Sequence, residues 1–331
     1  MLVKKLTDVC GLPGYENEVR ELIKDELKGH VDSIITDRMG NLIAVKNQNS
    51  PGRHIALSAH MDEVGLCIIF IDENGYLKFE TWGVDPRVLF SKAVLVGKNK
   101  IPGLIGALPF QLTPADQRTN AVPTDKLYID IGAKSKEEAE KSVSLGDFVA
   151  FKSDFMEFGE HKVKAKALDD RVGCAAIIEV LKNDCKNKLT GIFCVQEEIG
   201  MRGSAVAANR IDADLVIVVE GTVCADTDAE ETERQVTEQG LGPAISILDK
   251  RSVYLRKYTD TMIECAKKNN IPYQLRRTGI GGTDAGRYHQ AKGGAPCIGV
   301  SVPCRYIHSP VSVMDIRDYE NLVKLIKEYV K

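Results

Sequence analysis

The sequence lacks several features that would place it in a specialised class. It has no run of about 18 uncharged apolar residues, so it predicts no membrane-spanning helix. Its 44 Lys and Arg are balanced by 47 Asp and Glu, and a formal net charge of −3 gives no basic footprint for nucleic acid. No repeat of 20–50 residues and no low-complexity tract is visible. These absences leave an ordinary globular chain of 331 residues, whose 44% hydrophobic content is ample for a core.

Cysteine spacing excludes two further classes of protein. The nine cysteines are odd in number and scattered, and none forms a C-x-x-C pair. A disulfide framework or a thiolate zinc site is therefore not expected, and most of these side chains should be small buried apolar groups. The first residues contain no long apolar stretch that would indicate a secretory signal. Together these features favour a cytoplasmic enzyme or binding protein.

Periodicity predicts an α/β fold interrupted by a β-rich insertion. Residues 55–59 form a compact apolar strand that ends at His60, and strand and helix patterns alternate again from residue 165. Between these parts, two strand-like runs flank Asn74-Gly75, a sequence typical of a hairpin turn. We expect a mostly parallel or mixed central sheet flanked by helices, built from residues 1–64 and 165–331. Residues 65–164 form the inserted β-rich domain.

Acidic residues and histidines recur where predicted strands end or helices begin. His60, Glu198 and Glu220 follow or end strands, Asp169 opens a helix, and His308 follows the last long strand. All are potential ligands of divalent cations, and the carboxyl ends of parallel strands share one sheet edge. Each residue alone has an ordinary interpretation, such as a helix N-cap at Asp169 or a solvated pair at Glu197-Glu198.

Charge arithmetic supports a metal site if these residues converge. Asp169, Glu197, Glu198 and Glu220 carry four negative charges, which two divalent cations neutralise, whereas without cations they would repel one another. In the adjacent pair, one carboxylate can bind metal while its neighbour faces a water molecule. Asp62 lies two residues after His60 and can accept a hydrogen bond from the second imidazole nitrogen.

Six motifs in order carry a resemblance to a known family. They are SAHMDEVG at 58–65, ALDDRVG at 167–173, QEEIGMRG at 196–203, VVEGTVCAD at 218–226, GGTDAG at 281–286 and RYIHSP at 305–310. Together with GLPGYE near the start, they are similar to those of the dinuclear-metal cytosolic aminopeptidases of the tetrahedral (TET) and glutamyl aminopeptidase type. The resemblance spans nearly the whole chain and implies a zinc-aminopeptidase-like fold.

The resemblance implies a role for each of these residues. His60 and Glu220 complete one metal site, Glu198 and His308 complete the other, and Asp169 bridges the two ions. Glu197 is the general base of a water activated by the two metals, and Asp62 orients His60. Many relatives have Asp at the position of Glu220. Relatives also tend to have a cis peptide bond after the bridging aspartate, here between Asp169 and Asp170.

The resemblance also implies a cofactor, substrates and an assembly. Two divalent ions are expected per subunit, with zinc first and cobalt or manganese as alternatives, because such ligands accept all three. The substrates are peptides that lose their N-terminal residue. The inserted domain is expected to mediate homo-oligomer formation and substrate access, and a dodecamer, a dimer and a monomer all remain open.

Two other functions are compatible with parts of this sequence. An endoglucanase-type glycoside hydrolase could use paired carboxylates, but it needs no histidine pair, and aromatic residues that stack on sugars are only 6% of this chain. A non-catalytic peptide-binding scaffold would keep the fold, yet every expected ligand and the base are present. The glycine-rich stretch at 278–286 lacks the Gly-Lys-Ser/Thr ending of a phosphate loop, and it places Thr283 and Asp284 either near the substrate or in a tight turn with a helix cap.

Overall fold

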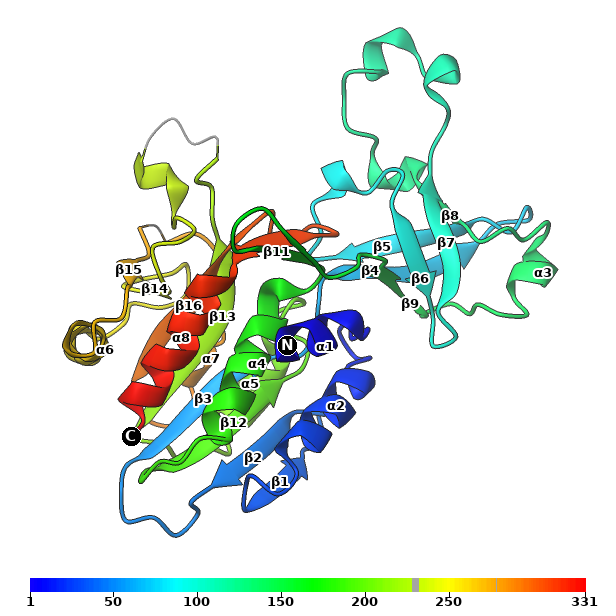
Figure 1. The fold of residues 1–331 in the computed structure, drawn as a ribbon. Coiled ribbons are helices and arrows are strands. Elements are labelled where there is room, and N and C mark those ends of the chain that lie inside the picture. The colour runs from blue at the N-terminus through cyan, green and yellow to red at the C-terminus, as the bar shows by residue number, and fades with distance from the viewer. Residues whose placement is uncertain (228–231, 278) are drawn as a thin grey trace. The chain divides into compact units, whose positions relative to one another are not determined.

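The computed structural model describes residues 1–227, 232–277 and 279–331, with the side chains of 232 and 233 left out (Figure 1). Thr278, the first residue of the glycine-rich stretch, lies outside the described residues. The chain divides into two compact units. Unit 1 comprises Met1–Glu63, Phe155–Ile307 and Ser312–Lys331, and unit 2 comprises Val64–Asp154 and His308–Val311.

Unit 1 is built on a mixed sheet, which among the described residues has eleven strands. The main path runs in the order β1 (Ser33–Thr36), β2 (Leu42–Lys46), β12 (Lys188–Cys194), β3 (His54–His60), β13 (Leu215–Val223), β16 (Cys297–Arg305), β17 (Ser312–Asp315), β11 (Lys162–Ala165) and β10 (Met156–Phe158). The short strands β14 (Ala244–Ile245) and β15 (Gln274–Leu275) pair beside β16. Strands β12, β3, β13 and β16 are mutually parallel, so their carboxyl ends share one edge.

Apolar residues on both faces of these strands explain the layers. In β3, Leu57 and Ala59 belong to the larger core, whereas Ala56 belongs to a smaller core on the other face. The larger core includes α1 (Leu2–Asp8), α2 (Asn17–Leu27), α4 (Leu168–Leu181), α6 (Arg256–Lys268) and α8 (Ile316–Tyr329). The smaller core includes α5 (Arg202–Ala207) and α7 (Ala285–Tyr288). The expected α/β sheet flanked by helices is confirmed, and it is mixed rather than wholly parallel.

Unit 2 contains a closed antiparallel barrel of six strands. Its order is β4 (Gly65–Ile71), β5 (Leu77–Trp82), β8 (Tyr128–Asp130), β7 (Ile101–Gly106), β6 (Ala93–Val96) and β9 (Phe148–Phe151). The predicted hairpin pairs β4 with β5, and Gly75 has the positive φ of 86° that its turn requires. Helix α3 (Lys136–Ala139) and the 3-10 turns η1 (Pro86–Val88), η2 (Phe110–Leu112), η3 (Ala115–Gln117) and η4 (Thr124–Lys126) connect the strands.

The unit boundary lies at Asp154 rather than at residue 164. Strands β10 and β11 pair with each other, and β11 pairs with β17 in the sheet of unit 1. Their local pattern resembles the barrel strands that precede them. The partner strand β17 begins at Ser312, and local periodicity carries no information about so distant a pairing.

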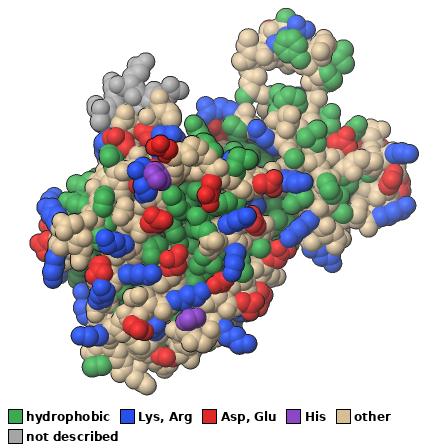
Figure 2. Space-filling view, in the orientation of Figure 1, with side chains coloured by type: hydrophobic (Ala, Val, Ile, Leu, Met, Phe, Trp, Pro, Cys, Tyr) green, Lys and Arg blue, Asp and Glu red, His purple; other side chains and the backbone are tan. Residues whose placement is uncertain are grey.

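The surface agrees with the balanced composition. Figure 2 shows basic and acidic side chains interspersed over the visible face. Among the described residues, no helix is long and apolar enough to cross a membrane.

Candidate metal centre

The shared edge of the parallel strands brings the acidic and imidazole side chains of unit 1 together. His60 is the last residue of β3 and lies opposite Cys194, the last residue of β12. Glu197 and Glu198 lie in the loop after β12, three and four residues beyond Cys194, and Glu220 lies within β13. Asp169 lies at the start of α4 and has a non-helical backbone there.

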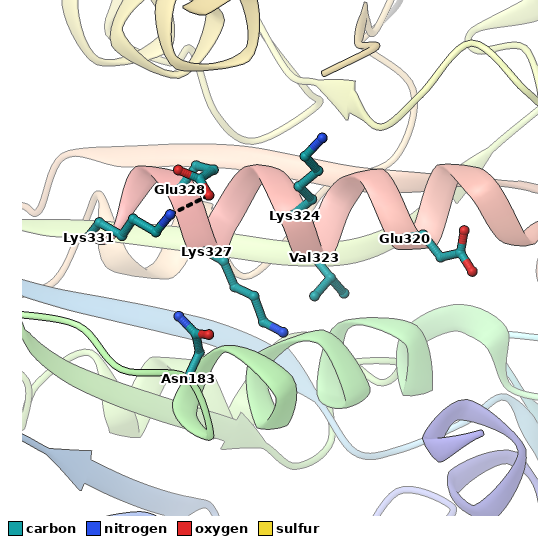
Figure 3. Close-up of a pocket in the computed structure, with 7 residues that line it drawn as sticks. All are labelled: Asn183, Glu320, Val323, Lys324, Lys327, Glu328 and Lys331. Carbon is teal, nitrogen blue, oxygen red and sulfur yellow. Dashed lines mark hydrogen bonds and ion pairs between the residues drawn. The ribbon is translucent and has the colours of Figure 1, made fainter. Parts of the chain in front are cut away.

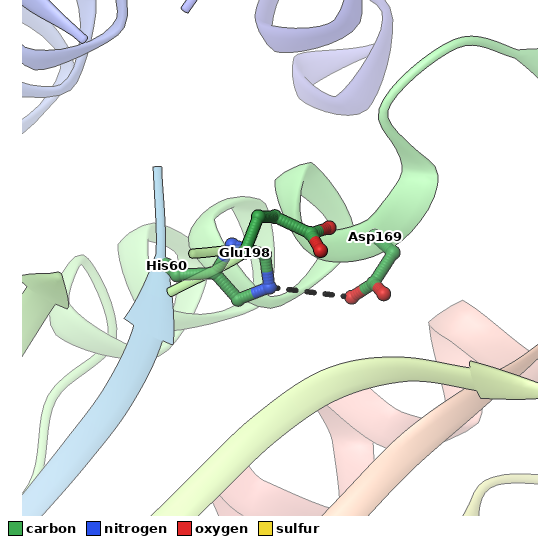
Figure 4. A group of neighbouring side chains, drawn as sticks. All are labelled: His60, Asp169 and Glu198. Carbon is green, nitrogen blue, oxygen red and sulfur yellow. Dashed lines mark ion pairs between the residues drawn. The ribbon is translucent and has the colours of Figure 1, made fainter. Parts of the chain in front are cut away.

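Three of the predicted ligands form a compact group. The ligand atoms of His60, Asp169 and Glu198 all lie within 4.8 Å of one another (Figure 4). The His60 Nε2 atom is 3.4 Å from the Asp169 Oδ1 atom. One imidazole and two carboxylates from three different elements therefore face a common point, which is a donor set typical of zinc and related divalent cations.

The second nitrogen of His60 faces the backbone. Its Nδ1 atom is 3.0 Å from the carbonyl oxygen of Asp62, and the Asp62 carboxylate is farther, at 3.6 Å from the same atom. A carbonyl oxygen only accepts hydrogen bonds, so Nδ1 donates to it, and Nε2 is the nitrogen that remains available to bind a metal ion beside Asp169 and Glu198. Asp62 thus orients His60 chiefly through its backbone.

Asp170 ties the start of α4 to the end of β3. Its buried carboxylate accepts the His60 N–H at 3.1 Å and the Gly173 N–H at 2.9 Å. The peptide bond between Asp169 and Asp170 is cis, as the resemblance implied. Packing is tight here, because a Cβ at Gly221 would lie 3.1 Å from both Cα and Cβ of Asp169. Sequence reasoning did not single out Asp170, since its pattern is also that of a helix cap.

The electrostatics of the group call for a cation. Burial, and then the charge of Asp169, raise the pKa of Glu198 well above its usual value. Burial also raises the pKa of Glu197 and of Glu220, and neighbouring carboxylates add to both effects. Burial alone would lower the pKa of His60, but the carboxylates of Asp169 and Asp62 next to its ring raise it well above the usual value. So much buried negative charge is held most readily by bound positive charge, and the residues fit divalent metal.

Glu220 lies beside this group rather than within it. Its Oε1 atom accepts the backbone N–H of Asp284 at 3.4 Å. Asp284 is fully buried, and burial raises the pKa of its carboxyl group. The glycine-rich stretch, which suggested that Asp284 lies near the pocket, therefore contacts a predicted ligand.

His308 belongs to unit 2. Its Nδ1 atom is 2.7 Å from the carbonyl oxygen of Gly83, so the ring is oriented by a backbone acceptor, as that of His60 is. Its pairing with Glu198 stays a prediction.

Three surface grooves of unit 1 lie away from these residues. One of about 330 Å³ is lined by Asn183 and by residues of the α8 region, including Lys324 and Lys327 (Figure 3). A second, of about 340 Å³, is next to β11, and a third, of about 450 Å³, is at the β1–β2 edge. None of the three includes a residue of the metal centre.

Comparison with known proteins gives a consistent result. A profile of the M42 glutamyl aminopeptidase family matches residues 40–325. The chain belongs to the M42 glutamyl aminopeptidase family.

Individual relatives cover nearly the full length of this M42 member. The lysyl aminopeptidase of Pyrococcus furiosus is 33% identical over 98% of this chain and 95% of its own. A TET aminopeptidase from a marine sediment Thaumarchaeota archaeon is 32% identical, with a TM-score of 0.95 over 100% of this chain and 95% of its own. A Pyrococcus horikoshii TET peptidase, described as able to assemble into a tetrahedron or a large octahedral shell, is 34% identical, with a TM-score of 0.88 over 99% and 98%.

Proposed function

We propose that this M42 aminopeptidase removes N-terminal residues from peptides with Glu197 as its general base. The observation that carries the proposal is the group of buried His60 and half-buried Asp169 and Glu198, with Glu197 adjacent to Glu198 in the chain. Family membership supports the reaction class, and the proximity of these residues supports our choice of the site.

Five residues would hold two divalent ions. His60 and Glu220 would hold one and Glu198 and His308 the other, with Asp169 between them, and zinc is our first choice over cobalt or manganese. When bound, such ions act as Lewis acids and lower the pKa of water.

The protein residues would move the protons. Glu197 would accept a proton from the attacking water and pass it to the leaving amine. Asp62 would keep Glu197 in place, because its Oδ1 atom accepts the Glu197 N–H at 2.9 Å. His60 would offer Nε2 as the ligand atom, since its Nδ1 proton is directed to the Asp62 carbonyl oxygen.

We further propose that the protein acts in the cytoplasm as a homo-oligomer, with the barrel of unit 2 as its assembly and substrate-access domain. Support comes from the relatives whose descriptions name tetrahedral or octahedral shells. The barrel strand β4 also presents Ile69 and Phe70, which are 46% and 52% exposed, and such exposed apolar groups suit burial between subunits.

A peptide panel tests the function. Short peptides with free or acetylated N-termini would be incubated with metal-free protein, before and after addition of zinc, cobalt or manganese. We expect metal-dependent release of single residues from the free-amine peptides only. Release from acetylated peptides, or cleavage of cello-oligosaccharides in a parallel arm, would contradict the proposal. No hydrolysis of any substrate would favour a peptide-binding scaffold.

A further inference from the structure

The four residues from Val195 to Glu198 follow β12 and include the two glutamates. The backbone N–H groups of all four donate hydrogen bonds to side chains rather than to a neighbouring strand. The Val195 N–H is 3.0 Å from Asn41 Oδ1, and the Gln196 N–H is 3.1 Å from Glu16 Oε1. The Glu197 and Glu198 N–H groups are 2.9 and 3.0 Å from the two carboxylate oxygens of Asp62.

The carbonyl side of the same segment is closed by its own chain. The Val195 and Gln196 oxygens accept the N–H groups of Gly203 and Arg202, at 3.0 and 3.1 Å. The Glu197 oxygen accepts two N–H groups, from Gly200 and Met201, both at 2.8 Å. The loop can therefore close on itself, but the orientation of its N–H side depends entirely on acceptors from elsewhere in the chain.

Those acceptors come from three separate parts of the chain. Glu16 precedes α2, Asn41 precedes β2, and Asp62 follows β3. Their exposed fractions are 2%, 0% and 0%, so water does not compete for these hydrogen bonds. The segment itself is locally unfavourable, because Gln196 has a φ of +56°, in the left-handed region that non-glycine residues rarely adopt.

Glu16 and Asn41 are themselves held in place. The same Glu16 oxygen also accepts the Gly14 N–H at 2.9 Å. The Asn41 amide nitrogen donates to Asp37 and to the Gly203 carbonyl oxygen, both at 2.9 Å. Asn41 thus bonds to both ends of the 195–203 loop.

We propose that Glu16 and Asn41 are positioning residues, which together with Asp62 set the direction of the Glu197 and Glu198 side chains through the backbone of residues 195–198. This inference rests on the proposed role of Glu197 as general base. Neither residue reaches the metal group itself. Each acts through the peptide units that fix the position of the Cα atoms of Glu197 and Glu198, from which the two side chains extend.

The test compares variants of Glu16 in the full-length, metal-loaded protein. Glu16→Ala removes the acceptor, and Glu16→Gln keeps an amide oxygen that accepts the same N–H. Because small displacements of a catalytic group are costly, we expect Glu16→Ala to lower kcat about 10- to 100-fold, with KM and metal content near the wild-type values. Glu16→Gln should retain kcat within about 3-fold.

A matched control separates positioning from general destabilisation. Asp318 is also fully buried and also accepts two backbone N–H groups, from Gly240 and Gly242 at 2.8 Å each. Asp318→Ala should lower stability and leave kcat unchanged. Equal losses of kcat in Glu16→Ala and Asp318→Ala would overturn the proposal.

Amide hydrogen exchange of the metal-free protein gives a readout that does not depend on turnover. Peptides covering residues 195–203 should exchange faster in Glu16→Ala than in the wild type, and at the wild-type rate in Glu16→Gln. Unchanged protection and kcat in Glu16→Ala would overturn the proposal. If the alanine variant does not fold, Glu16→Asp replaces it, because its shorter arm withdraws the carboxylate from Gln196. Absence of aminopeptidase activity in the wild type would refute the proposed function instead, while the exchange result would stand.

Discussion

The two units bury very different material. In unit 2 the described core is apolar throughout, with residues such as Leu66, Ile129 and Phe151. Every buried polar or charged side chain in the described part of the chain belongs to unit 1. The described interior of the barrel thus holds only apolar side chains, whereas the sheet of unit 1 also encloses an extended polar network.

This difference shows where the molecule tolerates the cost of buried charge. A buried ionised group is unfavourable unless it is paired and hydrogen-bonded. In unit 1, Glu63 is 2.7 Å from Lys166 and 3.2 Å from Arg171, and Arg171 also donates to the carbonyl oxygen of Met61. Glu63 directly follows Asp62 in the sequence and Arg171 directly follows Asp170, so the polar network of unit 1 adjoins the candidate metal centre.

The largest effect, a loss of kcat, is expected when the proposed general base is removed. Glu197→Gln keeps the size of the side chain but removes its ability to accept a proton. We expect kcat to fall about 10²- to 10⁴-fold with metal content unchanged, measured by steady-state kinetics and metal analysis. Glu137→Gln, an exposed change in α3 of unit 2, is the control that should leave kcat at the wild-type value. A Glu197→Gln variant with wild-type kcat would show that another group is the base.

The next largest effect, a loss of stability, is expected when the polar network of unit 1 is broken. Arg171→Met removes a fully buried cation that donates to Glu63 and to several carbonyl oxygens, and we expect the free energy of unfolding to fall by about 3–5 kcal/mol. Arg256→Met removes an exposed partner of Asp260 and should cost less than about 1 kcal/mol. Urea unfolding measures both. Equal losses would mean that burial does not decide the strength of these pairs.

A cavity in the barrel tests the apolar side of the comparison. Ile129 is fully buried in unit 2, and Ile129→Ala should cost about 2–4 kcal/mol through lost burial and the cavity left behind. Leu145 is 64% exposed, so Leu145→Ala should change stability by about 0.5 kcal/mol or less. Hydrogen exchange should place the loosening of the first variant in β5, β7 and β8. Loosening that begins in the sheet of unit 1 would contradict separate cores.

The smallest effect concerns pH. Burial, and then the nearby charge of Asp62, raise the pKa of Glu16 to about 6 from 4.5. The folded protein therefore binds the Glu16 proton more tightly than the unfolded chain does. The stability that this protonation contributes is complete below pH 4.5 and is lost as the pH rises through 6. Relative to Glu16→Gln, the wild type should lose about 2 kcal/mol of unfolding free energy between pH 4 and pH 7. A difference between the two proteins that does not vary with pH would contradict this.

Much of the fold was accessible from local pattern. The apolar run that ends at His60, the Asn74-Gly75 hairpin and the alternation of strands and helices all predict elements that the structure contains. Of the predicted ligands, His60, Asp169 and Glu198 lie together: His60 ends β3 and Glu198 follows β12 at the same sheet edge, and the start of α4 brings Asp169 beside them. The boundary at Asp154 was missed, because the pairing of β11 with β17 joins residues about 150 positions apart.

The sequence by itself determined which residues have the chemistry and which strands end beside them. Composition, periodicity and motif order are local properties, and they suffice for that. Only the tertiary structure decided what holds those residues in place. Glu16 and Gln196 are 180 positions apart, and Asn41 and Val195 are 154 apart. Such pairs form because strand register and core packing bring them within hydrogen-bond distance, and no feature near either residue in the sequence records that distance.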